Sequence, residues 1–582
     1  MSYTHNMHAE YRDVALEARE EVSEGRKEFL KLVGASGFSV LAAAACGGGS
    51  TGTSIGGGGA SASTPSAGGD LVLNDYESIL GPMADGWYYL SAFKEDYRWM
   101  NYGTVGSMPN TVLAEIATWH YDIAENPAGP TPWEVSNAVI RANCSKDMYG
   151  CLPQEMGVTF NTTDSMCKIV AGIKWKQNDI VLMTNNEHSG GLGPINVIAN
   201  RYGVKLREVN VPTGVSKGAN TGGYAEDGTL VARFEQQYQW AVNMGYNPRA
   251  IMFSSPPYTL GWRLEEKALC EWAISKGKNA NGDYLRIIVD GAHIPGAAPI
   301  DLHTMGCDYF GATAAKWHCG PGQTGYAYIR VGKKGDSPVS PSPFQGITVT
   351  TNEWTNPTEM EPFFINSAGY THFPTSAGYE GKWTLNNDLG GSLVSTGNPN
   401  YPTLKTLYEI NKLWQSIGRV NIAKYDQSLA QYLRQSLAQS DKMGLYSLGV
   451  DFQTPAGVVP TGQPNETTFP LMLQTGLTAV NPFSPGLDFN AALTPDQASA
   501  QSAASRALVK RIEAEYGIVV RNITTKHQLR SNPAASAKNV ATSGQALPAN
   551  QINTSSPLRI STHLYTRVQD VDRLVDALNT ML

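Results

Sequence analysis

Short apolar runs alternate with amphipathic segments from Asp179 to about residue 316, and this alternation constrains the fold more than any other feature of the chain. It predicts strands in DIVLMTN, KLREVNV, AIMFSSPP and LRIIVDGA, and helices in GPINVIANRYG, FEQQYQWAV and LEEKALCEWAISKG. Strands separated by helices of this length imply crossover connections and a mostly parallel sheet between helices. Because ligands bind beyond the carboxyl ends of such strands, Asp290, at the end of one predicted strand, is a candidate site residue.

Composition narrows the class of protein. A chain of 582 residues with 41% hydrophobic and 16% charged residues is typical of globular folding in more than one domain. The net charge of -7 gives no basic patch that would favour nucleic acid. The seven cysteines form no CxxC pair and no metal-ligand spacing, so no metal site is expected. Cys144 and Cys151 are either a disulfide of an oxidising compartment or two buried thiols.

The N-terminal region has the pattern of an export signal over residues 1–46. The segment RKEFLK, from Arg26 to Lys31, resembles the twin-arginine pattern, and a mild apolar run follows it. AAAC resembles a lipobox, which predicts a lipid anchor at Cys46 and a periplasmic location. Residues 47–75, rich in Gly, Ser and Ala, predict a flexible tether. The alternative is a disordered extension with an incidental apolar patch.

Two chemically informative residues lie near the end of the alternating region. Asp290 ends one predicted strand, and Lys316 directly follows another, YFGATAA. A carboxylate and a lysine at one edge of a sheet are either a structural ion pair or part of a functional site, and their spacing alone favours the ion pair.

The residues around Asp290 and Lys316 favour the second alternative, a functional site. VDGAHIPG, followed by KWHCGPGQTG, resembles the class V aminotransferase family of fold-type I pyridoxal-phosphate enzymes, and most of all its isopenicillin N epimerase-like branch. The resemblance covers about residues 99–582. It implies a large pyridoxal-phosphate-binding domain over residues 76–390, with its N-terminal segment, and a smaller α+β domain over residues 391–582. STGNPN, from Ser395, resembles a loop donated by a partner subunit, which implies a homodimer.

The resemblance assigns four residues to the cofactor ring. Lys316 would hold pyridoxal 5'-phosphate as a Schiff base, which requires a desolvated amine with a lowered pKa. Asp290 would pair with the pyridinium nitrogen and keep the ring an electron sink. His293 would lie near the phenolic oxygen. His188, in TNNEHSGG, would stack on the ring face; without the resemblance it reads as a surface histidine.

The resemblance also indicates which residues would bind the cofactor phosphate and which would bind the substrate. Thr162 and Thr163, at the start of a predicted helix, would bind the phosphate together with Thr313; two threonines before a helix are otherwise an ordinary cap. Arg559, in PLRISTHLY, would bind the substrate carboxylate with its planar fork. The alternative is a structural ion pair with Asp570 or Asp572.

A further turn, WMNYGTVGSMP, resembles the family segment whose backbone, here residues 103–105, approaches the substrate. The family residue before the lysine is histidine, whereas this chain has Ala315. ALTPDQASAQSAAS and residues 531–556 are expected to be long inserted loops, either lids or disordered.

The expected reaction is transamination or epimerisation at the Cα of an amino acid or peptide-like amine. No cysteine follows Cys319, so the nucleophile of cysteine desulfurases has no counterpart in the expected loop. A lyase of the same family and a non-catalytic binding protein that retains the fold remain alternatives. A serine hydrolase is disfavoured because the chain has no GxSxG elbow.

Overall fold

The computed structural model describes residues 80–127 (except 82), 137–209, 211, 230–330 (except 262), 400–438, 444–445, 475–482, 494–526 and 554–582. The expected export signal with Cys46, the tether, and the STGNPN loop up to residue 399 lie outside the described residues. So does most of the expected insertion at 531–556.

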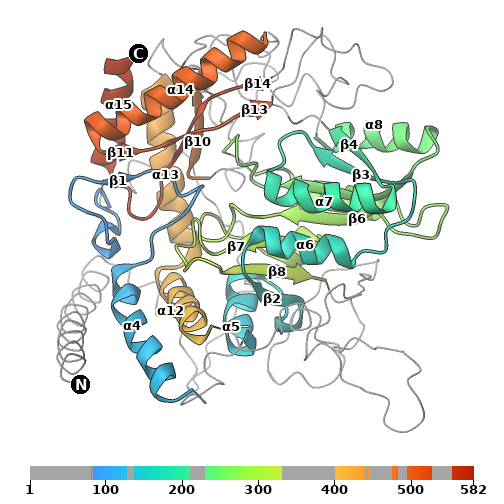
Figure 1. Ribbon diagram of the computed structural model, residues 1–582, viewed down its shortest axis with the longest axis horizontal. Coiled ribbons are helices and arrows are strands. Elements are labelled where there is room, and N and C mark those ends of the chain that lie inside the picture. The colour runs from blue at the N-terminus through green and yellow to red at the C-terminus, as the bar shows by residue number, and fades with distance from the viewer. Residues whose placement is uncertain are drawn as a thin grey trace, which may run out of the picture.

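A seven-stranded sheet forms the larger layer, in the order β2-β8-β7-β6-β5-β3-β4 (Figure 1). Strands β3 to β7 pair in parallel, and β2 and β8 add an antiparallel edge. The strands are β2 (Met156–Thr159), β3 (Asp179–Thr184), β4 (Lys205–Val209), β5 (Asn247–Ser254), β6 (Arg286–Asp290), β7 (Tyr309–Thr313) and β8 (Gly325–Ile329). The predicted mostly parallel sheet is confirmed.

Helices cover both faces of this sheet. On one face, α6 (Thr162–Gly172) and α7 (Ser189–Tyr202) share a core cluster with strand residues such as Val181 and Met183. On the other face, α8 (Leu230–Asn243) and α9 (Glu266–Ser275) share a second core cluster with Ile180 and Leu182, which alternate with those residues along β3. Successive residues of a strand point to opposite faces, so a strand covered on both sides is apolar throughout.

A second sheet of four short strands, in the order β12-β15-β10-β9, lies beside the first. Its strands are β9 (Gly444–Leu445), β10 (Leu477–Asn481), β12 (Arg521–Asn522) and β15 (Leu558–Ser561). The segment LRIS, which contains Arg559, forms β15. Helices α13 (Arg419–Ala438), α14 (Pro495–Tyr516) and α15 (Val568–Met581) belong to this part, whereas α12 (Tyr401–Ile417) lies beside α4 (Asn110–Glu125) and α5 (Asn137–Cys144) (Figure 1).

The N-terminal segment packs on this second part. β1 (Arg98–Trp99) pairs in parallel with β11 (Ile518–Val519), and Asn101 bridges to Ser561 at the end of β15. Helices α4 (Asn110–Glu125) and α5 (Asn137–Cys144) follow before the large sheet begins. The start of the described chain is therefore held against strands that come near its C-terminal end.

The expectation of an inserted loop in ALTPDQASAQSAAS is wrong, because Pro495 to Ser505 lie in helix α14. Thr494 caps the helix and forms a reciprocal capping box with Gln497. Proline is favoured in the first turn, and the alanines that follow have the highest helix propensity of any residue. These local signals outweigh the polar composition that suggested a loop.

The structure also decides between the two alternatives for the cysteine pair. Cys144 and Cys151 are buried free thiols in the structure rather than a disulfide. Within the described ranges, no helix is both long and apolar enough to cross a bilayer.

Candidate active site

Asp290 and Lys316 are brought to one edge of the large sheet by neighbouring strands. Asp290 is the last residue of β6 and is 2% exposed, and Lys316 follows the end of β7 by three residues. Burial raises the pKa of Asp290, although the nearby Lys316 charge opposes this. Lys316 forms no ion pair with Asp290; its Nζ lies 3.2 Å from His293 Nε2. The structural ion pair is therefore not the reason for this arrangement.

The Lys316 amine has the properties of a nucleophile. It is half-buried, and desolvation lowers its pKa to about 8; Arg559 and Arg521 lower it further, against the opposing charge of Asp290. A larger fraction of the amine is consequently neutral near pH 8 than for an ordinary lysine.

In protein freed of pyridoxal phosphate, we expect the rate at which Lys316 is modified by trinitrobenzenesulfonate to rise with pH through a midpoint near 8. Only the neutral amine reacts, so the midpoint reports the pKa of the group. Peptide mapping after short exposures at pH 6 to 11 measures the rate, with Nα-acetyl-lysine as the reference. A midpoint near 10.5 would show that the amine is not desolvated.

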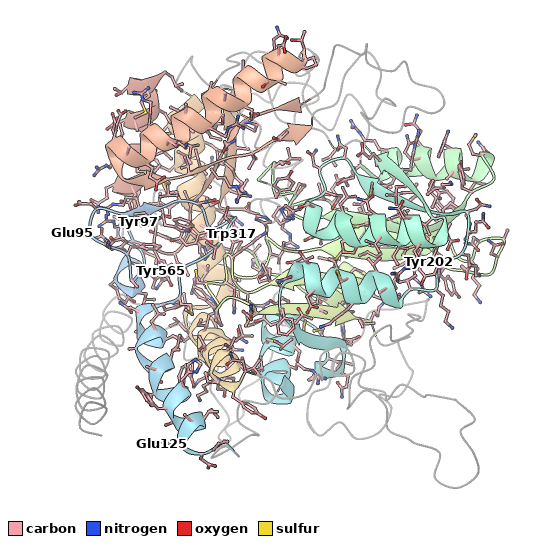
Figure 2. The ribbon with its side chains drawn as sticks, in the orientation of Figure 1. Glu95, Tyr97, Glu125, Tyr202, Trp317 and Tyr565 are labelled. Atoms are coloured by element: carbon pink, nitrogen blue, oxygen red, sulfur yellow. The ribbon has the colours of Figure 1, made fainter. Side chains whose placement is uncertain are left out.

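His293 connects the lysine to a buried indole. Its Nδ1 accepts a hydrogen bond from Trp317 Nε1 at 3.1 Å, and burial holds its pKa well below the ordinary value. The neutral ring therefore carries its proton on Nε2, which faces Lys316 Nζ. Trp317 is fully buried, between the large sheet and Gly476 before β10 (Figure 2).

His188 occupies the N-cap of α7 at the mouth of the site. Its Nδ1 accepts a hydrogen bond from Gly190 N at 3.0 Å, and its ring meets Tyr258 edge to face at 5.1 Å. Burial, followed by the charges of Lys316 and Arg559, lowers its pKa to about 4. The ring is therefore neutral and carries its proton on Nε2.

Glu187 was missed in the sequence, although it precedes His188. Its carboxylate accepts hydrogen bonds from Ser254 N at 3.0 Å and Ser254 Oγ at 2.6 Å, and from Thr184 Oγ1. Burial, with a contribution from Asp290, raises its pKa to about 7. The hydrogen bonds join the loop after β3 to the end of β5 and fix the position of His188.

The N-termini of α6 and α7 meet beside Asp290. A Cβ on Gly190 would lie 2.7 Å from Thr163 Oγ1, and one on Gly191 would lie 2.8 Å from Asp290 Oδ2. Asn161, not a threonine, caps α6 by accepting a hydrogen bond from Asp164 N at 2.9 Å. Helix capping was the alternative to phosphate binding for Thr162 and Thr163. Neither threonine has that role, because Asn161 caps the helix.

The side chain of Thr162 indicates that the region between the N-termini of α6 and α7 fits an anion. Its hydroxyl is buried and has no hydrogen-bond partner among the described residues. A buried hydroxyl without a partner is costly, and a helix N-terminus attracts negative charge. Thr313 is less available, because its Oγ1 donates to Thr324 O at 3.1 Å and accepts from Ala315 N at 3.2 Å.

Arg559, on β15, is 3% exposed and hydrogen-bonds only to neutral oxygens within the described part of the chain. Its Nη2 donates to Thr104 Oγ1 at 2.7 Å and Asn101 Oδ1 at 3.3 Å, and its Nη1 donates to Tyr258 O at 3.4 Å. A Cβ on Gly103 would lie 2.9 Å from its Cζ. The predicted N-terminal turn therefore does reach the site.

The alternative role for Arg559 is excluded by the partners of the two aspartates. Asp570 pairs with Arg98 at 2.7 Å and Arg567 at 3.1 Å, and Asp572 accepts from Tyr432 at 2.5 Å. Burial, with the neighbouring Arg521, lowers the pKa of Arg559 to about 9. A buried guanidinium without a carboxylate is poised to bind one.

A buried ion pair supports the lysine loop from behind. His563 Nδ1 lies 2.6 Å from Asp426 Oδ2, and its Nε2 hydrogen-bonds to Trp317 O. Burial alone would lower the pKa of His563, but Asp426 outweighs burial and raises it to about 10. Nothing in the sequence flags this pair, because its members are 137 residues apart.

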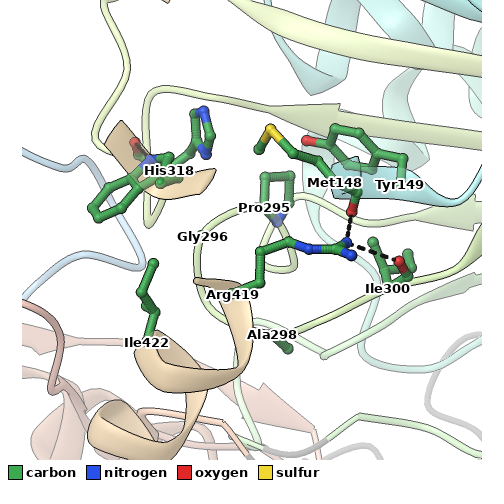
Figure 3. Close-up of a pocket in the computed structure, with 10 residues that line it drawn as sticks. Met148, Tyr149, Pro295, Gly296, Ala298, Ile300, His318, Arg419 and Ile422 are labelled. Atoms are coloured by element: carbon green, nitrogen blue, oxygen red, sulfur yellow. Dashed lines mark hydrogen bonds between the residues drawn. The ribbon is translucent and has the colours of Figure 1, made fainter. Parts of the chain in front are cut away.

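A hollow is lined in part by His318, two residues after Lys316 (Figure 3). Met148, Tyr149, His318 and Ile422 are among its lining residues, and Arg419 closes it by donating to the carbonyls of Met148 and Ile300. Of the predicted site residues, the structure brings together Lys316, Asp290, His293, His188, Thr162, Thr163, Thr313 and Arg559, and none of them lines this hollow.

Comparison with known proteins assigns the fold. No family model matches the chain. It is 23% identical over 235 residues to isopenicillin N epimerase of Streptomyces clavuligerus, covering 40% of this chain and 54% of that protein. The chain spans about half the length of the curated relatives it matches.

Two solved structures cover more of the chain. The cystine C-S lyase C-DES, in complex with its product cysteine persulfide, has a TM-score of 0.55 and 19% identity over 83% of this chain and 97% of that one. The cysteine desulfurase CsdA of Escherichia coli has a TM-score of 0.55 and 14% identity, over 86% and 98%. The fold is therefore that of the fold-type I pyridoxal-phosphate enzymes. Within that fold, these relatives confirm the resemblance to the class V aminotransferase-like family.

Proposed function

We propose that this chain is a pyridoxal-phosphate enzyme that acts at the Cα of an amino acid or a peptide-like amine, by transamination or epimerisation. The observation that carries the proposal is the half-buried Lys316 amine, held at the carboxyl ends of β6 and β7 beside Asp290 without forming an ion pair. Pyridoxal phosphate, when bound, supplies an electron sink that acidifies the Cα proton.

The residues of the chain divide the remaining work. Lys316 would hold the cofactor and would also move the Cα proton, for which a pKa of about 8 suits neutral conditions. Asp290 would pair with the ring nitrogen of the cofactor, and His188 would cover its ring face. The N-termini of α6 and α7, with the Thr162 hydroxyl, would hold its phosphate. Arg559 orients the substrate by its carboxylate.

We expect borohydride to trap pyridoxal phosphate on Lys316 in purified protein that has been supplied with the cofactor. Reduction fixes the attachment, so mass mapping of the reduced peptide identifies the residue. Exposed Lys412, which pairs with Glu409 at 3.1 Å, serves as the internal control. An adduct on another lysine, or none, would contradict the proposal.

A lyase activity is the second candidate, and the likeness to the cystine C-S lyase favours it. Elimination also begins with loss of the Cα proton, so it requires the same lysine. The absence of any cysteine after Cys319 supports a reaction other than that of cysteine desulfurases. Incubation with cystine and with the L and D forms of alanine separates the reactions by their products. Pyruvate from cystine marks elimination, racemised alanine marks epimerisation, and pyruvate from alanine together with the aminated cofactor marks transamination.

A further inference from the structure

A second arginine stands directly opposite Arg559 in the smaller sheet. Strand β12 pairs antiparallel with β15, and the register places Arg521 across from Arg559. Residues directly opposite on neighbouring strands have adjacent side chains, and two like charges in this position are destabilising. Arg521 was not noticed in the sequence, although VVRNIT has the same apolar flanks as LRIS.

Both guanidiniums are held on one hydroxyl. Arg521 Nη1 donates to Thr104 Oγ1 at 2.8 Å, and Arg559 Nη2 donates to the same oxygen at 2.7 Å. Thr104 in turn donates to Asn101 Oδ1 at 2.7 Å. The hydroxyl therefore uses its donor and two acceptor positions, and it fixes the two cations side by side.

Among the described residues, the cluster of two arginines has no negatively charged hydrogen-bond partner. In the part of the chain that the structure describes, the hydrogen bonds of Arg521 and Arg559 all go to neutral oxygens. Both arginines are also close enough to disfavour the charged form of Lys316. The carboxylate of Asp290 opposes this effect of the two arginines on the lysine. Such a concentration of cations favours an anionic ligand with more than one negative group.

The two arginines differ in burial, and this difference indicates different roles. Arg559 is buried and has an unpartnered Nε, whereas Arg521 is exposed at the rim. An α-amino acid that places its amine at Lys316 and its carboxylate at Arg559 uses up the deep groups. Arg521 then remains available to the part of the substrate that lies farthest from the α-carbon, at the rim of the site.

We propose that Arg521 binds a second carboxylate on the substrate, so that the substrates of this site are amino dicarboxylates or peptide-like amines with a distal carboxylate. This inference rests on the proposed function, because it takes Arg559 as the partner of the α-carboxylate. Arginine suits the second position for the same reason as the first: its planar fork matches a carboxylate with two parallel hydrogen bonds.

The test compares matched ligands in protein supplied with the cofactor. Aspartate, glutamate and 2-aminoadipate are each paired with the analogue that has a methyl group in place of the distal carboxyl group, and Kd is read from the change in the cofactor spectrum. Wild type should bind at least one diacid about tenfold more tightly than its analogue. Arg521→Ala should remove that preference and leave the Kd of the analogue within about twofold. Arg521→Lys should restore part of the preference.

Arg506→Ala is the matched control, because Arg506 is an exposed arginine on α14 that contacts only Ser502 Oγ, at 2.7 Å, among the described residues. This variant should retain the preference for diacids. If Arg521→Ala raises the Kd of a diacid and of its analogue equally, the inference is overturned, because Arg521 would then bind the α-carboxylate that both ligands share. The absence of any preference for a diacid in wild type would also overturn it.

A cofactor-free measurement keeps the two proposals separate. Glutarate should raise the thermal midpoint of the apo protein more than valerate does, and Arg521→Ala should remove this difference. If glutarate behaves in this way while no adduct forms on Lys316, the proposed function fails and the arginine pair stands. If the adduct forms but glutarate and valerate act alike, the second carboxylate site fails alone.

Discussion

Replacing Lys316 with alanine is expected to lower kcat by about 10⁴-fold, because the variant loses the group that moves the Cα proton. Cofactor should still bind without a covalent bond, because Asp290, Thr162 and the N-termini of α6 and α7 are untouched. Steady-state kinetics on the substrate found by screening measures the rate, and gel filtration followed by absorbance measures the retained cofactor.

Lys412→Ala is the control for this loss, since it removes an exposed lysine that pairs with Glu409. Its kcat should equal that of wild type. An added primary amine, such as methylamine, should recover part of the activity of Lys316→Ala by supplying the missing base. If Lys316→Ala retains kcat within tenfold of wild type, another residue moves the proton and the assignment is wrong.

Arg559→Ala is expected to lower kcat/KM for carboxylate substrates by about 10²- to 10³-fold, the loss typical of truncating one partner of a buried charge pair. The thermal midpoint should not fall. In the free protein Arg559 is a buried cation bonded only to neutral oxygens of the described chain, so removing it leaves no carboxylate there unpaired. Arg559→Lys should recover only part of the loss, because an ammonium cannot form the bidentate fork.

Arg98→Ala gives the opposite result and so provides the control. Arg98 pairs with the buried Asp570 at 2.7 Å, and its loss leaves that carboxylate with Arg567 alone. We expect a lower thermal midpoint and an unchanged kcat/KM. If Arg559→Ala resembles Arg98→Ala, with early unfolding and normal turnover, Arg559 is structural.

Sequence was a good guide where periodicity and chain order determine the structure. Strands β3, β5, β6 and β7 each contain a short apolar run, so both their type and their parallel arrangement followed from the pattern. The position of Asp290 followed as well, because a polar residue after such a run lies at the sheet edge. Helix α14 did not follow, since its few buried residues, Ser505, Leu508 and Ile512, give only a weak apolar stripe.

The rest of the site depends on pairing between distant segments. Arg521 meets Arg559 only through the register of β12 with β15, and short strands of two and four residues leave little pattern to read. His563 and Asp426 come together through the packing of α13, where a polar pair in an apolar surrounding has no local signature. Such contacts become visible only in the three-dimensional structure.

The contact between Thr104 and Arg559 has a consequence for the order of events during synthesis. The two residues are 455 positions apart, whereas Asp290 and Lys316 lie on neighbouring strands. A ribosome adds roughly 5 to 20 residues per second, so the hydroxyl waits tens of seconds for its arginine. Before that interval ends, every strand of the large sheet has been synthesised, whereas the partner strand of β1, β11, is made only near its end. The lysine and carboxylate thus meet early, whereas the arginine pair forms only when β12 and β15 have emerged from the ribosome.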